Sequence, residues 1–76
     1  GGLNMWIQAE DIHGRKSCIN LDYISCINPQ KVSVDIVFSD GAVARIKPTF
    51  INADGRESST YIRLCSLLTN GHTNFC

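Results

Sequence analysis

The stretch KVSVDIVFSDGAVARIK, residues 31–47, decides the fold expected for this chain. Apolar and polar residues alternate along each half, which is typical of strands with one buried face. The apolar face of the first half comprises Val32, Val34, Ile36 and Phe38. The central SDG carries Gly41, and glycine can adopt the positive φ that a tight hairpin turn needs. The stretch therefore predicts an antiparallel hairpin with one buried and one solvated face.

Small apolar residues alternate with basic residues in the second half of this hairpin. The apolar set comprises Ala42, Ala44 and Ile46. The other face carries Arg45 and Lys47, which we expect to point into solvent. Asp35, on the outward face of the first half, can lie opposite either cation, a pairing worth roughly 0.2–1 kcal/mol. The strand register decides between the two, and the sequence leaves it open.

Three more short strands are predicted before this hairpin. Residues 5–9 alternate with a period of two, and a turn around Gly14 leads to a second strand in residues 17–21. Asn and Asp side chains compete for nearby backbone groups, so we expect the line INLDYISCI, residues 19–27, to form a corner at its centre. Residues 24–27 resume as a third strand, which ends at NPQ because proline donates no hydrogen bond.

The segment after Pro48 is polar and rich in turn-forming residues. Residues 49–57, TFINADGRE, contain Asn, Asp and Gly in close succession. We interpret them as a loop of about nine residues, which is long for a compact domain. Phe50 and Ile51 would be its apolar anchors.

Residues 58–70 fit a helix better than a strand. At helical spacing, one face carries Tyr61, Leu64, Cys65 and Leu68. Ser58 or Ser59 is suited to the N-cap, and Gly71 follows the expected end. In the alternative interpretation the segment is a strand, NADG is a second hairpin turn, and the fold is a small all-β barrel.

These elements predict one α+β domain over residues 5–70. It would be a small antiparallel β-meander of about five strands with one short C-terminal helix. We interpret residues 1–4 as an expression remnant before a natural start at Met5, and residues 71–76 as a flexible tail.

The composition argues against several classes of function. Seven basic side chains balance seven acidic ones in 76 residues, so no net charge attracts nucleic acid or an anionic membrane. A net charge near zero also removes self-repulsion, which favours a homodimer. No apolar run approaches the roughly 18–20 residues of a membrane span, and no signal peptide is evident. We therefore expect a cytoplasmic protein without a membrane segment.

Four cysteines stand at positions 18, 26, 65 and 76. Their spacing is not the paired C-x-x-C of a zinc site, so no metal or other cofactor is predicted. Without a signal peptide we expect reduced thiols, although two disulfides in any of three pairings are the alternative.

No catalytic signature stands out, and we expect a protein that is not an enzyme. Glu10 and Asp11 are adjacent, but neighbours on a strand point to opposite faces, which works against shared acid–base chemistry. Cys26 with His13 lacks the third orienting group of a nucleophilic site. A chain this short also rarely encloses a catalytic pocket.

The order of turns and apolar positions resembles small bacterial and phage β-meander proteins of the FlbD/SwrD flagellar-associated type. The matching residues are Gly14, Ile19, Asn20, Asp22, Ile24, Ile27, Val34, Ile36, Asp40, Gly41 and Ile46. The likeness covers roughly residues 5–70, and the chain departs from it in TFINADGRE and in its cysteines. The resemblance implies a non-enzymatic accessory or regulatory protein. A weaker likeness is to LytTR-type DNA-binding domains, whose terminal strand carries more basic residues than Arg63 alone provides.

The favoured hypothesis is therefore a small regulatory protein or inhibitor that binds a protein partner through its sheet face or an edge strand. The predicted partner-binding residues are Trp6, Arg45, Lys47, Phe50 and Ile51. We expect Trp6 to be buried beneath the helix, and the alternative is an exposed interface anchor. A nucleic-acid-binding regulator that uses Arg45 and Lys47 is the alternative function.

Overall fold

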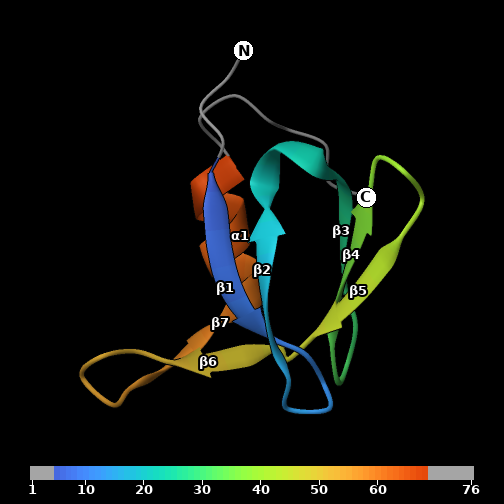
Figure 1. The fold of residues 1–76 in the computed structure, drawn as a ribbon. Helices are drawn as coiled ribbons and strands as arrows, with labels where there is room; N and C mark the ends of the chain where they lie inside the picture. The colour runs from blue at the N-terminus through green and yellow to red at the C-terminus, as the bar shows by residue number, and fades with distance from the viewer. Residues whose placement is uncertain (1–4, 69–76) are drawn as a thin grey trace.

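The computed structural model describes residues 5–68, which form seven short strands, one 3-10 turn and one α-helix (Figure 1). The elements in chain order are β1 (Trp6–Glu10), β2 (Lys16–Asn20), η1 (Leu21–Tyr23), β3 (Ile24–Pro29), β4 (Val34–Phe38), β5 (Val43–Ile46), β6 (Thr49–Ile51), β7 (Glu57–Ser59) and α1 (Thr60–Leu68). This confirms the predicted α+β class with a C-terminal helix. The domain limits proposed at residues 1–4 and 71–76 lie outside the described residues.

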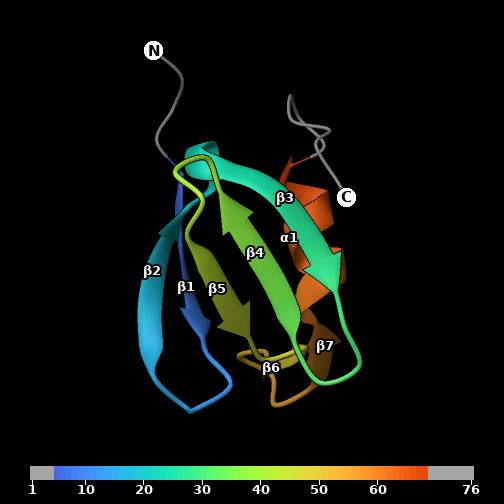
Figure 2. The same cartoon turned by 90° about the vertical axis from the view of Figure 1, so that its right-hand side faces the viewer.

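The strands form antiparallel ladders between neighbours in the chain. β1 pairs with β2, β3 with β4 and β4 with β5, while β6 pairs with β7. A short seam joins the first two groups, where Asp11 bridges Ile46 and the Lys47 amide donates to the Glu10 carbonyl. Through this seam, β1 to β5 make one bent antiparallel meander, with α1 behind β1 (Figures 1 and 2).

The central hairpin has the register that its alternation predicts. Val34 and Ile36 are buried, and Asp35 lies opposite Arg45 with a carboxylate-to-guanidinium distance of 3.7 Å. The register therefore selects Arg45 as the partner of Asp35. Val32 was placed on the apolar face, and this was wrong: the strand begins at Val34, and Val32 is 78% exposed in the turn before it.

The predicted corner after β2 is the 3-10 turn η1. The Asn20 side chain accepts a hydrogen bond from the Asp22 amide at 2.9 Å, as expected of a residue that competes for local backbone groups. Beyond the turn, β3 runs along β4 with a register shift between Ile24 and Cys26. The corner thus carries the chain from the β1–β2 pair to the three-stranded sheet.

The segment TFINADGRE was interpreted as a loop, and this was wrong. Its first three residues form β6, and its last residue, Glu57, begins β7. The two strands pair with Ile51 opposite Glu57 and Thr49 opposite Ser59. The turn is closed by a hydrogen bond from the Asn52 amide to the Arg56 carbonyl, and Gly55 takes a φ of 85°. Strands of three residues are too short to show alternation, which is why the loop was favoured. The hairpin turn at NADG belonged to the all-β alternative, and the structure has this turn together with a helix after it. The two extra strands also raise the count above the five expected.

The helix α1 follows β7 without a loop, and this excludes the all-β alternative. The Ser59 hydroxyl accepts from the Ile62 amide at 3.2 Å, which is the N-cap interaction predicted for Ser58 or Ser59. Leu64 and Leu68 are buried, as the helical spacing requires, whereas the proposed stop at Gly71 lies outside the described residues. Within residues 5–68, no helix is long and apolar enough to cross a membrane.

The hydrophobic core lies between the bent meander and the buried face of α1. It comprises Ile19, Leu21, Ile24, Ile27, Val34, Ile36, Ile46, Leu64 and Leu68. Four of its side chains are almost completely shielded from solvent, namely Ile27, Ile36, Leu64 and Val34. Because a chain of this length buries a small core, each of these four side chains contributes a large share of the free energy of folding.

We expect Ile36→Val to lower the free energy of unfolding by about 0.5–1.5 kcal/mol, because it removes a methylene from a fully buried site. Urea denaturation followed by circular dichroism measures the change. Val32→Ala is the matched control, and we expect it to stay within about 0.5 kcal/mol of the unmodified chain. Equal effects of the two substitutions would contradict this description of the core.

Candidate functional site

A groove is lined by residues of β1, the β6–β7 hairpin and α1. Figure 1 shows where these three elements lie. The volume of the groove is about 890 Å³, within the range of roughly 300–1,000 Å³ that ligand sites occupy. The apolar lining comprises Ile7, Ala9, Ile36, Ile46, Phe50, Ile51, Ala53 and Leu64. The polar and charged lining comprises Gln8, Glu10, Lys16, Lys47, Thr49, Asn52, Glu57, Thr60 and Arg63. Such a groove suits an apolar segment with polar groups along its sides.

One wall of the groove is an edge of β1 that is only partly paired. The Leu21 amide donates to the Met5 carbonyl and the Asp11 amide to the Arg15 carbonyl, so odd-numbered residues of β1 direct their backbone groups to β2. Even-numbered residues therefore direct theirs to the opposite edge. There, the seam with β5 uses Glu10, and within residues 5–68 no other element bonds the backbone of Trp6 or Gln8. The first half of β1 thus offers strand-pairing groups beside the groove.

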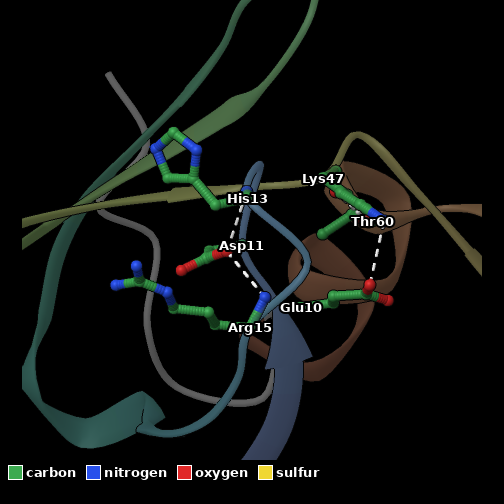
Figure 3. Close-up of polar contacts among 6 residues, drawn as sticks. All are labelled: Glu10, Asp11, His13, Arg15, Lys47 and Thr60. Carbon is green, nitrogen blue, oxygen red and sulfur yellow. Dashed lines mark hydrogen bonds and ion pairs between the residues drawn. The ribbon is translucent and has the colours of Figure 1, made fainter.

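The seam is reinforced at the groove by Glu10 and Lys47. The Lys47 ammonium donates to Glu10 Oε1 at 2.9 Å, and both side chains are partly exposed. Figure 3 shows the Glu10 side chain reaching toward Lys47, beside Thr60 at the start of α1. The Thr60 hydroxyl donates to the Lys47 carbonyl at 2.7 Å, so Lys47 connects β1 to the helix.

Phe50 and Arg63 form another rim of the groove. The Arg63 guanidinium lies over the Phe50 ring, 5.0 Å from its centroid, which is a cation–π contact. This contact joins β6 to α1. Phe50 is half-buried, whereas the next residue, Ile51, is 65% exposed. The groove therefore has an aromatic wall with a neighbouring exposed aliphatic side chain.

The structure brings together three of the five predicted partner-binding residues. Lys47, Phe50 and Ile51 all line the groove. Arg45 does not line it, and its guanidinium lies beside Asp35 on the outer sheet face. Trp6 was expected to be buried, but it is 59% exposed and lines a different hollow.

The two cations predicted to bind nucleic acid, Arg45 and Lys47, are each paired with a carboxylate. Arg45 lies beside Asp35 and Lys47 beside Glu10, so each cation faces a carboxylate. Phosphate binding depends on cations that are free to replace counterions. The alternative function stays a prediction, and a phosphate at these two cations would have to compete with Asp35 and Glu10.

Glu10 and Asp11 point to different places, as expected of neighbours at the end of a strand. Asp11 Oδ1 accepts from the Arg15 amide at 2.9 Å and from the His13 amide at 2.8 Å (Figure 3). The hydrogen bond from Arg15 lowers the pKa of Asp11, and the His13 amide and the nearby charges of both side chains act in the same direction. Asp11 therefore holds the β1–β2 turn, and the two carboxylates share no site.

The cysteines depart from the reduced state that we expected. Cys26 is disulfide-bonded, which corrects that expectation, while Cys18 and Cys65 are free thiols. Cys65 hydrogen-bonds Tyr61 on α1, and this contact raises the pKa of the Tyr61 phenol. Among residues 5–68, no three His, Cys, Asp or Glu side chains gather in a way that could hold a metal ion.

No family model, curated protein or solved structure matches this chain. The resemblance to FlbD/SwrD-like proteins therefore stays a prediction, and the site is interpreted from its geometry. Sequence reasoning missed Gln8, Arg63 and Leu64 as groove residues. Helical spacing already placed Leu64 on the inner face of α1, but that it lines the same groove as β1 and β6 required the fold.

We expect the Glu10–Lys47 pair to contribute about 0.2–1 kcal/mol of coupling, because both groups are partly exposed. A double-mutant cycle with Glu10→Gln and Lys47→Met, read out by urea denaturation, measures it. The coupling should decrease as salt rises from low to high concentration. A coupling that is absent at low salt would contradict the pair.

We expect Asp11→Asn to reduce stability most at neutral pH, because asparagine keeps an acceptor but lacks the charge. The pKa of Asp11 is lowered by folding, so its stabilising effect is present above the pKa of the unfolded chain. That effect is lost as pH falls through the lowered pKa of the folded chain. Melting temperatures of both chains between about pH 7 and pH 2 test this. A difference that does not change with pH would contradict it.

Proposed function

We propose that this chain is a small non-enzymatic interaction module that binds an extended segment of a protein partner at the free edge of β1. The observation that supports the proposal is the half of β1 at Trp6 and Gln8, whose backbone no other element within residues 5–68 bonds on this edge. It lies beside a groove lined by both apolar and polar side chains. Addition of a strand satisfies such an edge through main-chain hydrogen bonds. Side chains of the added segment then provide specificity.

The groove supplies the pockets that such a segment needs. A strand laid beside β1 directs alternate side chains toward the groove, because strand side chains alternate between faces. Those side chains would meet Leu64 of α1 and Phe50 of β6. The other side chains would point to solvent. We therefore propose a partner segment with apolar residues at alternate positions.

Charge at the groove adds a preference to this proposal. Lys47 and Glu10 neutralise each other, whereas Lys16 and Arg63 exceed the remaining carboxylate of Glu57. A partner segment with an acidic residue would meet these cations. An accessory or regulatory role, as the resemblance implies, is compatible with binding of this kind, and the predicted homodimer would compete with the partner segment if it used the same edge.

The decisive experiment removes the free donor of Gln8. We expect a library of displayed ten-residue peptides to yield binders of the chain, and Gln8→Pro to weaken them by about tenfold or more. Proline removes an N–H that the β1–β2 ladder does not use. Gln8→Ala is the matched control, which keeps the N–H and should bind within about twofold.

Fluorescence anisotropy with a selected peptide measures both variants, and circular dichroism establishes that each is folded. Hydrogen exchange of the unmodified chain should show protection of the Trp6 and Gln8 amides when peptide is bound. A library that yields no binder, or peptides that bind Gln8→Pro as well as the unmodified chain, would overturn the proposal. If Gln8→Pro instead dissociates a dimer of the chain, the edge serves a second copy and the peptide proposal fails.

A further inference from the structure

A second hollow lies at the start of β1, and its lining comes from β1, β2, η1, β4 and the β4–β5 turn. Figure 2 shows the η1 corner and the β4–β5 turn at the same end of the molecule. The volume of this hollow is about 350 Å³, at the small end of the range for ligand sites. The lining residues are Trp6, Cys18, Ile19, Asn20, Tyr23, Phe38, Ser39 and Asp40. Only Ile19 and Asn20 of this set are buried, so the hollow opens to solvent.

Aromatic side chains from three elements surround this hollow. Trp6 of β1 and Tyr23 of η1 are each 59% exposed, and Phe38 at the end of β4 is half-buried. Exposed aromatic rings that gather around one depression are unusual on a small monomer and mark binding surfaces. These three rings therefore form walls without covering the hollow.

The backbone holds these walls in place. Trp6 lies opposite Asn20 in the β1–β2 ladder, and Asn20 in turn anchors η1 through the Asp22 amide. The Ser39 amide donates to the Tyr23 carbonyl at 2.8 Å, which ties η1 to the end of β4. The hollow is thus built before any ligand arrives, which reduces the entropy lost on binding.

The charge of the hollow is negative. Asp40 is the charged residue among the lining residues that the structure describes, and none of these is basic. The Asp40 carboxylate is fixed at the turn, because its Oδ1 accepts from the Ala42 amide at 2.9 Å. Aromatic faces attract cations through their quadrupole, and a nearby carboxylate adds to this attraction. The combination selects a positively charged ligand over a neutral one.

We propose that this hollow binds a cationic side chain of a partner protein, a guanidinium or an alkylammonium group, between Trp6 and Tyr23 with Asp40 as the counter-charge. The hollow shares no lining residue with the groove, although the backbone of Trp6 belongs to the β1 edge described above. The proposal does not depend on the function proposed for the groove. In this proposal the exposed Trp6 ring contacts the bound cation from one side of the hollow.

The chain contains its own reporter for this site, because Trp6 is its only tryptophan. We expect N-acetyl-arginine amide and N-acetyl-lysine amide to change the tryptophan fluorescence of the full chain in a saturable way. Isolated side chains should bind roughly in the millimolar range. N-acetyl-citrulline amide is the neutral isostere of the arginine probe, and it should produce no saturable change at the same concentrations. Saturable binding of either cation supports the proposal.

Two variants separate charge from aromatic contact. Asp40→Asn keeps an acceptor for the Ala42 amide but removes the charge, and it should weaken the cation about fivefold. Tyr23→Ala removes one wall and should weaken it to a similar extent. Val43→Ala is the matched control, because Val43 is exposed on β5 and lies outside the hollow.

Three results would overturn the proposal. One is the absence of a saturable fluorescence change with either cation. Another is binding of citrulline as tight as that of arginine, which would show an apolar hollow without charge selection. The third is Asp40→Asn binding as the unmodified chain does, while its circular dichroism and melting temperature show the same fold.

Discussion

The seam between the end of β1 and the end of β5 is the constraint on which the rest of the structure depends. It consists of the Asp11–Ile46 bridge and of backbone hydrogen bonds from Lys47 to Glu10 and from Ile12 to Arg45. Without it, β1–β2 would be an isolated hairpin, which is marginally stable in water. With it, the hairpin becomes part of a larger sheet that closes over Ile46 and the inner face of α1.

The seam also explains the groove. β5 ends at Ile46 and the chain turns away at Pro48, so only the last part of β1 is paired on that side by another described strand. The start of α1 is held beside this turn by two hydrogen bonds. The Thr60 amide donates to the Pro48 carbonyl, and the Thr60 hydroxyl donates to the Lys47 carbonyl. The turn of the chain at Pro48 therefore accounts for three features of the groove: the free edge of β1, the wall formed by β6 and the wall formed by α1.

Local patterns predicted the parts of this fold that rest on local physics. The hairpin of residues 31–47, the corner at Asn20 and the helix with its Ser59 cap all follow from alternation, turn chemistry and end signals. The free edge of β1 could not be predicted, because it depends on where a strand far away in the sequence ends. The burial expected for Trp6 was wrong for a similar reason. Alternation shows which side chains share a face of β1, but not whether another element packs against that face.

Each ladder in the described structure joins strands that follow one another in the chain. Contacts between near neighbours in sequence cost little loop-closure entropy, so the hairpins can form early and independently. The Glu10–Lys47 contact, between residues 37 positions apart, belongs to the long-range closure that remains. Folding of this chain is thus expected to be fast and limited by the meeting of preformed hairpins. The same locality lets the tip of β6–β7 change in length without disturbing the order in which the meander assembles.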